Sequence, residues 1–334
     1  RATKTCSRYA AYPCAHHTRF QHALGWSHLM QNAVQVLRSK NVDISYEEED
    51  ALYKAILLHD IGHGPFSHAM EHSIINNVSH EDISILFMES LNKEFNGSLT
   101  LAIQIFKGAY HRPFMMQLIS SQLDMDRLDY LKRDSFYTGV AEGNINSQRL
   151  IAMLNVKNDE LVIEEKGIYS VEHFLSSRRL MYWQVYLHKT GIGAEHLLQS
   201  VFVRIKELIG KGIEVDLPSD LKYFLTHGIT LAHFTQENLN RFARLDDTDL
   251  ITTLKLGSQH EDFVLQELCN MILNRQLLKI KFSKEPISDK KLQKKKHQLI
   301  KARSLSDHEA QYFVFSGAVH NLAYAKAKPI KILL

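Results

Sequence analysis

The sequence places two metal-type ligands side by side in the pair His59-Asp60, at the end of an apolar stretch and before a turn with two glycines and further histidines. A neutral imidazole beside a carboxylate suits Zn, Fe, Mn or Ni better than Ca or Mg alone. Because the glycines favour unwinding of the helix, we expect His63 to lie in the turn and to point into a cleft beside the metal. One helix end supplies too few ligands, and His22 upstream and Asp126 downstream are the candidates for the others.

Two polar stripes accompany these ligands. Asp126, Tyr130 and Asp134 are spaced i, i+4, i+8 and therefore share one face of a predicted helix. The second stripe combines cationic and aromatic side chains, a pattern suited to phosphates and a ring, although helix packing explains its aromatic residues equally well. Its members are Arg178, Tyr182, Tyr186 and Lys189.

The elements that must position these residues are mostly helices, since apolar residues recur at helical spacing. Helices are predicted over residues 22–39, 47–61, 80–95, 99–108, 116–137, 171–189 and 194–209. Alternating residues on both sides of Asn158-Asp159 predict a β-hairpin over 153–164. Beyond Pro218 we expect short helices, with strands at 312–315 and 330–333. A soft boundary divides the chain into residues 1–210 and 211–334.

The composition limits the classes of protein to which this chain can belong. At 334 residues the chain can form one large domain or two smaller ones, and its formal net charge of +3 is mildly basic. Three cysteines without CxxC spacing cannot all pair, which favours a reducing, cytoplasmic compartment. No apolar run is long enough to span a bilayer and no signal peptide is recognised, so we expect no membrane partner.

A run of lysines occupies positions 290, 291, 294, 295 and 296 in the C-terminal part. A charge run of this kind is typical of a solvated face of a helix. The alternative interpretation is a surface for nucleic acid or for a nucleotide effector, for which the small net positive charge adds only weak support.

The ordered set His22, His59-Asp60 and Asp126 resembles the H…HD…D signature of the HD superfamily of metal-dependent phosphohydrolases. Longer strings narrow the resemblance to the deoxynucleoside triphosphate triphosphohydrolases, namely residues 12–22, 59–68, 79–81 and 126–134. The likeness extends well over about the first 200 residues and loosely over the C-terminal end. It implies a mainly α HD-domain fold with a small β-hairpin and a mixed α/β C-terminal lobe packed on the HD domain.

The resemblance also implies a reaction. The metal ligands would be His22, His59, Asp60 and Asp126. They would hold a divalent transition metal (Fe, Mn, Zn or Ni), with Mg as a second ion, and water activated there would attack the α-phosphorus of a dNTP to release deoxynucleoside and inorganic triphosphate. His63, and His80 held by Glu81, would handle protons as catalytic residues. Indirect support of the metal ligands is the alternative role for these three residues.

Contacts with the substrate follow from the same resemblance. The phosphate contacts would be Arg19, Arg127 and Arg178, with His68 near the α-phosphate. Tyr130 would pack beneath the sugar, where a 2′-hydroxyl would clash, and Asp134 would accept a hydrogen bond from the 3′-hydroxyl. Tyr186 would pack on the sugar or base.

Three places depart from the family pattern. Cys14 stands where relatives usually have Gly, which concerns the local turn and not the metal. Leu187 stands where the human member has Gln, and residues 4–6 do not match the family's usual Gln-Leu-Gly in a region that normally touches the nucleotide, so the preferred base stays open. The alternatives are an HD phosphohydrolase acting on another phosphoester, such as a nucleoside monophosphate or cyclic nucleotide, and a non-catalytic nucleotide sensor. The three arginines favour a triphosphate, and the intact ligand set argues against a sensor. Because relatives are tetramers, we expect a homo-oligomer.

Overall fold

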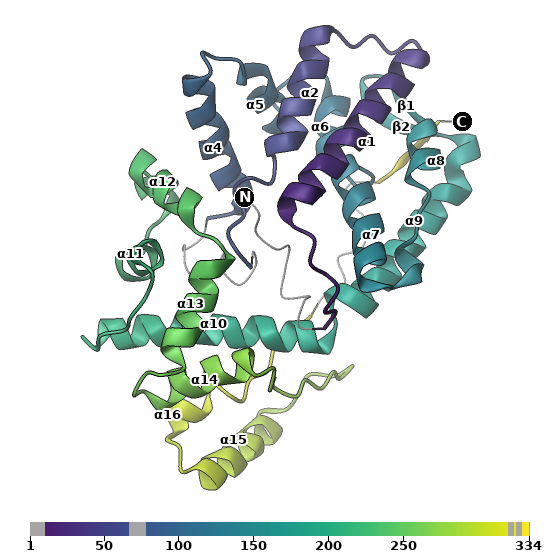
Figure 1. Ribbon diagram of the computed structural model, residues 1–334. Coiled ribbons are helices and arrows are strands. Elements are labelled where there is room, and N and C mark those ends of the chain that lie inside the picture. Colours follow the sequence, from purple (N-terminus) through teal and green to yellow (C-terminus); the bar gives the residue numbers. More distant parts are fainter. Residues whose placement is uncertain (1–10, 67–77, 320–323, 325–328, 334) are drawn as a thin grey trace.

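The computed structural model describes residues 11–66, 78–319, 324 and 329–333, and it is mainly helical with one small sheet (Figure 1). The predicted fold class is therefore confirmed. In the described parts of the chain, no helix combines the length and the apolar character that crossing a membrane requires.

The first group of helices consists of α1 (Arg19–Ser39), α2 (Tyr46–Leu58), α4 (His80–Glu94), α5 (Thr100–Phe106), α6 (Pro113–Ile119), α7 (Met125–Thr138), α8 (Ser147–Ala152) and α9 (Ile168–Met181). In this group, α1, α2, α4, α5 and α9 match predicted helices, whereas α8 was not predicted. Local sequence fixes several of their starts, because Thr18, Ser45 and Ser79 each form a capping box at an N-terminus. Helix α1 packs against both α2 and α7, which brings together the three elements that carry the candidate metal ligands (Figure 1).

The predicted helix over 116–137 is wrong, because the structure divides it into α6 and α7. Ser120 ends α6 in an extended conformation, and Asp124 caps α7 by accepting a hydrogen bond from the Arg127 backbone N–H at 2.7 Å. The break places Asp126 in the first turn of α7 instead of the middle of a long helix. A carboxylate is stabilised there by the helix dipole.

The hairpin prediction is confirmed by β1 (Leu154–Lys157) and β2 (Glu160–Glu164), which pair antiparallel. Asn158 and Asp159 both have positive φ, as a two-residue type I′ turn requires. A third strand, β3 (Lys331–Leu333), pairs parallel to β2 and gives the order β1-β2-β3. The predicted strand near the C-terminus is thus confirmed, and it lies on the part of the molecule that contains the hairpin.

The second part of the chain is a group of helices built around one long helix. Helix α9 continues into a π-helical turn, η4 (Tyr182–Tyr186), and α10 begins at Lys189. The remaining helices are α10 (Lys189–Gly210), α11 (Ser219–His227), α12 (Gln236–Arg244), α13 (Asp247–Gly257), α14 (Phe263–Leu273), α15 (Asp289–Arg303) and α16 (Asp307–Ala310). Short 3₁₀ turns lie at η2 (Ala141–Gly143), η3 (Glu165–Gly167) and η5 (Leu231–His233).

The strand predicted at 312–315 is wrong. Tyr312 is buried against α10, and its hydroxyl donates a hydrogen bond to Glu207 Oε2 at 2.6 Å. The segment therefore packs through side chains after α16 and forms no strand. Its high β-propensity is overridden by this packing.

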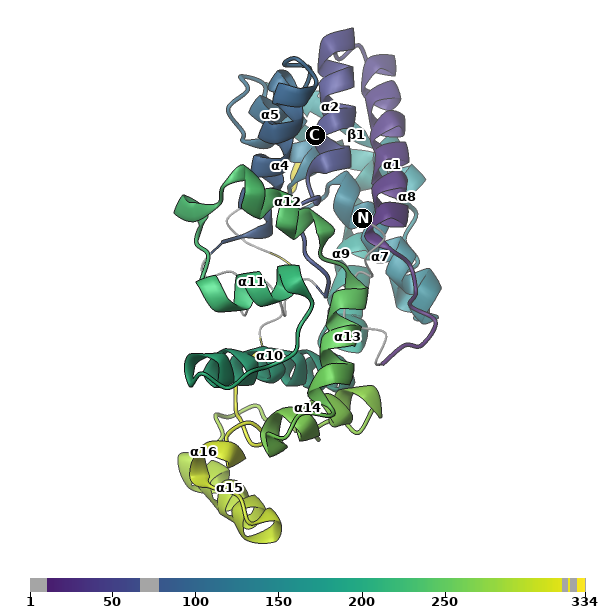
Figure 2. The same ribbon diagram turned by 60° about the vertical axis from the view of Figure 1, so that its left-hand side comes forward.

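Two apolar cores organise the molecule. The first contains Trp26, Phe114 and Phe174 and is enclosed by the first helices and the hairpin. The second contains Phe202 and Phe224 and joins α10 to the helices that follow it. Figure 2 shows α10 crossing between the upper group of helices and α14 to α16. The predicted boundary at residue 210 falls at the end of α10, whose apolar residues belong to the second core. The division into residues 1–210 and 211–334 stays a prediction.

Candidate metal-dependent active site

The His59-Asp60 pair lies where α2 ends. His59 caps the helix, and its Nδ1–H donates a hydrogen bond to the Ile56 carbonyl at 2.7 Å. The proton on Nδ1 leaves a lone pair on Nε2. His59 Nε2 lies 3.6 Å from Asp60 Oδ1 and 4.0 Å from Asp126 Oδ1, so this lone pair faces two carboxylates.

His22 reaches the same place from α1. Its Nε2 lies 3.0 Å from Asp126 Oδ1, and its Nδ1 is hydrogen-bonded to Asp129. The Asp129 carboxylate is held in turn by two bonds from Arg133, at 2.7 and 2.9 Å. A Cβ at Gly25 would lie 2.0 Å from Asp129 Oδ1, so only glycine leaves room for this carboxylate. Asp129 thereby orients His22 with Nε2 towards Asp126.

Trp26 separates the two histidine ligands. Its ring centroid lies 4.1 Å from that of His22 and 4.3 Å from that of His59, and the indole is almost completely buried. A rigid indole between the two imidazoles limits how each can rotate. Trp26 is a site residue that the sequence analysis missed, although its i+4 spacing from His22 places it on the same helix face.

His63 and His80 form a second pair beside Asp60. Their rings stack with centroids 3.7 Å apart and planes 14° from parallel, and His63 Nε2 lies 3.4 Å from Asp60 Oδ1. A Cβ at Gly62 would lie 2.2 Å from the His80 carbonyl oxygen, so this glycine lets the turn approach the start of α4. The nearby Glu81 carboxylate lies 3.3 Å from His80 Nε2.

The charges around these groups set their protonation. Burial lowers the pKa of His22, but its hydrogen bonds with Asp126 and Asp129 outweigh burial and raise the pKa to about 9. Burial, followed by the charge of Arg19, lowers the pKa of His63 to about 4, so this imidazole is neutral at pH 7. Burial raises the pKa of Asp60, yet His63, His59 and Arg19 hold it well below its usual range. The site therefore contains an ionised carboxylate and a neutral imidazole in contact.

Several donor atoms are spaced as metal ligands require. Ligands about 2.1 Å from one ion lie roughly 3 to 4 Å from each other, and three of the separations given above lie in that range: His22 to Asp126, His59 to Asp60 and His59 to Asp126. A second grouping shares one member: single donor atoms of Asp60, His63 and His80 all lie within 4.8 Å of one another. Both groupings consist of imidazole and carboxylate, the ligands of a divalent transition metal.

The three arginines predicted to contact phosphate have different partners. Arg19, the first residue of α1, donates to Asp60 Oδ2 at 2.7 Å. Arg127 bonds the Ser121 carbonyl and the Asp124 carboxylate. The third is Arg178, whose side chain is 2% exposed and whose Nη1 donates to Gln122 Oε1 at 3.2 Å.

A row of aromatic side chains, Tyr130, Tyr186 and Tyr182, extends from His22 along α7 and η4. The Tyr130 ring lies edge-on to His22, with centroids 6.5 Å apart, and edge-on to Tyr186 at 5.9 Å. Tyr182 contacts Tyr186 at 5.0 Å, and the Arg178 guanidinium lies 5.9 Å from the centre of the Tyr182 ring. The π-helical turn shifts the predicted cationic and aromatic stripe out of regular α periodicity, so that Lys189 begins α10 instead of extending the stripe.

Two further substrate contacts were predicted, Asp134 and His68. Asp134 is 1% exposed, and its Oδ1 lies 3.0 Å from Nε2 of the equally buried His17, whose ring stacks on Tyr137. His17 is a further residue that the sequence analysis missed, since it precedes α1 and shares no periodic pattern with Asp134. His68 lies outside the described residues.

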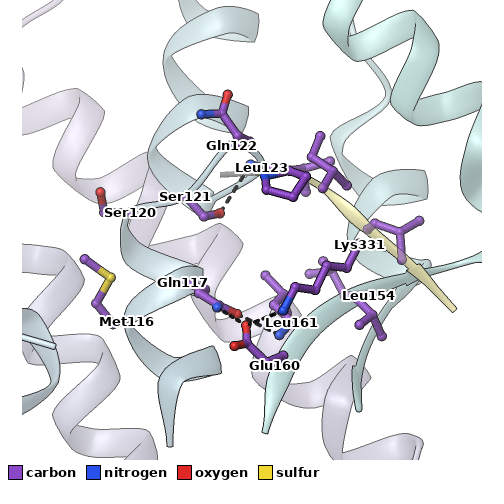
Figure 3. Close-up of a pocket in the computed structure, with 14 residues that line it drawn as sticks. Met116, Gln117, Ser120, Ser121, Gln122, Leu123, Leu154, Glu160, Leu161 and Lys331 are labelled. Atoms are coloured by element: carbon purple, nitrogen blue, oxygen red, sulfur yellow. Dashed lines mark hydrogen bonds and ion pairs between the residues drawn. The ribbon is translucent and has the colours of Figure 1, made fainter. Parts of the chain in front are cut away.

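A separate pocket of about 410 Å³ opens behind the loop that leads into α7 (Figure 3). The loop residues Ser120 to Leu123 form one wall, and β2 and β3 form another. Gln117, Glu160 and Lys331 meet at one end of it (Figure 3). None of the predicted metal ligands lines this pocket, and Gln122, which also bonds Arg178, connects it with the site.

Two regions of the chain match known families. Residues 19–134 match the HD domain, and residues 145–212 match the HD associated region. The chain belongs to the HD-domain phosphohydrolase family. A crystal structure of a phosphohydrolase from Bacteroides thetaiotaomicron is 49% identical, covers 96% of this chain and 82% of that one, and superposes with a TM-score of 0.93.

Other relatives are more distant. The uncharacterized protein YwfO of Bacillus subtilis is 32% identical over 279 residues, which is 80% of this chain and 62% of YwfO. This chain thus spans less than two thirds of that relative. The human deoxynucleoside triphosphate triphosphohydrolase SAMHD1 is 24% identical over 245 residues, which covers 60% of this chain and 39% of the human protein.

Proposed function

We propose that this chain hydrolyses deoxynucleoside triphosphates to deoxynucleoside and inorganic triphosphate. The observation that carries the proposal is the position of one Asp60 oxygen, 3.6 Å from His59 Nε2 and 3.4 Å from His63 Nε2. A set of metal-type ligands and a neutral imidazole thus meet at a single carboxylate. Relatives named deoxynucleoside triphosphate triphosphohydrolase in human and Dictyostelium discoideum support the choice of substrate.

His22, His59, Asp60 and Asp126 would hold the divalent transition metal, Fe, Mn, Zn or Ni. When bound, such an ion lowers the pKa of water and neutralises charge on a phosphoryl group. Asp129, Arg133 and Trp26 would keep the histidine ligands in place through the contacts described above. Mg would accompany the triphosphate of the substrate.

In the reaction, the oxygen of water forms a bond to the α-phosphorus while the bond from that phosphorus to O5′ breaks. One proton leaves the attacking water, and another must reach O5′ of the departing deoxynucleoside. His63 can accept a proton because its low pKa keeps the imidazole neutral. His80, with Glu81 at 3.3 Å from Nε2, is suited to hold and deliver one.

The remaining side chains would bind the substrate. Arg19, Arg127 and Arg178 supply positive charge for the triphosphate, and His68 would lie near the α-phosphate. Tyr130 would exclude a 2′-hydroxyl and Tyr186 would pack on the sugar or base, while Asp134, fixed by His17, would accept from the 3′-hydroxyl. We further propose, from the family resemblance, a homotetramer in the cytoplasm.

Product analysis tests this function. Purified protein with Mn or Mg is incubated in ¹⁸O-labelled water with each of the four dNTPs, GTP and ATP. We expect deoxynucleoside and intact triphosphate, with ¹⁸O in the triphosphate, and slower turnover of GTP and ATP. His59→Ala should abolish the reaction, whereas His28→Ala should retain it, because His28 is an exposed histidine on α1 that contacts Asn32.

Other outcomes would change the assignment. Orthophosphate or pyrophosphate as the only inorganic product would contradict attack that breaks the bond to O5′ and would favour hydrolysis of another phosphoester. Turnover that persists in His59→Ala would remove the metal set from the reaction. An inactive protein, even with all four dNTPs mixed as activators, would favour the nucleotide sensor.

A further inference from the structure

Helix α15 differs from every other long helix of the described chain, because none of its residues is buried. It lies at the end of the molecule remote from α1 and α7, beyond α14 and α16 (Figures 1 and 2). Two ion pairs fasten it to its neighbours: Lys296 Nζ lies 2.7 Å from Asp307 Oδ2, and Arg303 pairs with Glu267 on α14. The helix is therefore fixed on the body and exposed along its length.

The two sides of α15 have different chemistry. Leu292, Lys296, Leu299 and Ile300 are half-buried and lie on one side, within an arc of about 100° at 100° per residue. The opposite arc, about 140° wide, contains five exposed lysines. They are Lys290, Lys291, Lys294, Lys295 and Lys301. Within the described residues none of these five has an ion-pair partner.

The positive charge of the protein is concentrated on this helix. Residues 289–303 contain seven Lys and Arg and one Asp, whereas the rest of the chain has 33 Lys and Arg against 36 Asp and Glu. The body is thus slightly acidic, and the net positive charge comes from α15. Lysines four residues apart on one face, such as Lys290 and Lys294 or Lys291 and Lys295, repel each other and lower helix stability, and a bound anion would offset this repulsion.

We propose that the lysine face of α15 binds the phosphate backbone of double-stranded nucleic acid without reading its sequence. From Lys290 to Lys301 the face is about 16 Å long at 1.5 Å per residue. Duplex DNA carries one charge per roughly 1.7 Å of its axis, so a stretch of this length carries on the order of ten phosphates, enough for each of the five lysines to meet one. Lysine suits this contact because it acts as a point charge towards phosphate.

The same features argue against other anionic partners. A helix that enters a membrane surface needs a wide, free apolar side, but α15 has only Leu292, Leu299 and Ile300 on that side, and all three are half-buried. Binding of a single strand relies on stacked aromatic rings, and α15 contains no Phe, Tyr or Trp. A duplex backbone fits a face that offers charge alone.

The test measures binding of the full chain to a fluorescein-labelled 20-base-pair DNA duplex by polarisation over a series of salt concentrations. The triple variant Lys290→Gln, Lys294→Gln, Lys295→Gln should bind at least about tenfold more weakly. It should also reduce the slope of log affinity against log salt by about 0.9 for each phosphate that the protein no longer neutralises. The matched control is Lys93→Gln, Lys222→Gln, Lys255→Gln, which removes three exposed lysines from α4, α11 and α13.

Equal binding by the two triple variants, or no binding by the unchanged protein, would overturn the proposal. Binding to vesicles with 30% phosphatidylserine but not to the duplex would assign the face to a membrane instead. A fluorescein-labelled single strand that binds more tightly than the duplex would contradict the choice of a double strand. Since none of these lysines belongs to the proposed catalytic site, dNTP hydrolysis should be equal in both variants, and the two proposals can fail independently.

Discussion

The His22 imidazole is held from both of its nitrogens, by Asp126 at Nε2 and by Asp129 at Nδ1. Only the first contact concerns a predicted metal ligand. Asp129 acts through His22, because its oxygen accepts from Nδ1 and so keeps Nε2 turned towards the site. The close fit of Gly25 and the two bonds from Arg133 leave this carboxylate one position. Asp129 is therefore a positioning residue for the candidate metal site.

We expect Asp129→Asn to weaken metal binding by about 10- to 100-fold, because an amide is a poorer acceptor and its NH₂ group can turn towards His22. Competition with a chromophoric chelator for Mn or Zn measures the change directly. Asp43→Asn, at an exposed carboxylate, is the control and should bind metal like the unchanged protein. Unaltered affinity in Asp129→Asn would show that His22 is oriented without this carboxylate.

At the scale of elements, the turn after α2 must lie against the start of α4. The Gly62 backbone N–H donates to Ser84 Oγ at 2.9 Å, and the missing side chain lets the two backbones approach. This approach stacks His63 on His80 and leaves both beside Asp60. The geometry of the proposed proton-transfer pair thus depends on one backbone contact between two elements.

Gly62→Ala should force the turn away from α4, since its Cβ would lie 2.2 Å from the His80 carbonyl oxygen and 2.4 Å from the Ser84 nitrogen. We expect a loss of about 1–3 kcal/mol in the free energy of unfolding, as for other overpacked sites, measured by urea denaturation. Gly210→Ala in α10 should change little, because nothing lies within 4 Å of a Cβ there. A Gly62→Ala protein as stable as the Gly210→Ala protein would disprove the close approach.

At the scale of the whole molecule, α10 connects the site-bearing helices to the second core. Arg204 on α10 binds the Asp262 carboxylate through two nitrogens, Nε at 2.9 Å and Nη2 at 2.5 Å. The same carboxylate caps α14 by accepting from the Leu265 N–H. Burial raises the pKa of Asp262, but these bonds outweigh burial and leave the pKa below its ordinary value of 3.8.

This pair predicts an acid-dependent part of the stability. Because the pKa of Asp262 is lower in the folded chain than in the unfolded one, its contribution is complete above the ordinary pKa and is lost as pH falls through the folded value. Asp262→Asn should cost about 2 kcal/mol of unfolding free energy at pH 7 and less below pH 4. Urea denaturation at pH 7 and at a pH below 4 tests this prediction. Glu261→Gln, at an exposed neighbouring residue, is the control. A loss that is the same at both pH values would contradict the linkage.

Local sequence alone determined the kinds of residue in the site and most of the elements that carry them. The capping boxes at Thr18, Ser45 and Ser79 and the turn at Asn158-Asp159 involve residues that are neighbours in the chain. Such signals do not depend on the rest of the fold, which is why the helices and the hairpin could be predicted. The His59-Asp60 pair and the spacing along α7 were readable for the same reason.

Only the tertiary structure decided which distant residues meet. Asp129 reaches His22 and His17 reaches Asp134 across more than a hundred residues, and β3 joins β2 in parallel from the far end of the chain. The end of α6 before α7 was likewise missed, because periodic apolar residues continue across the break. These features depend on how the packed helices fit each other, and no pattern of neighbouring residues encodes that fit.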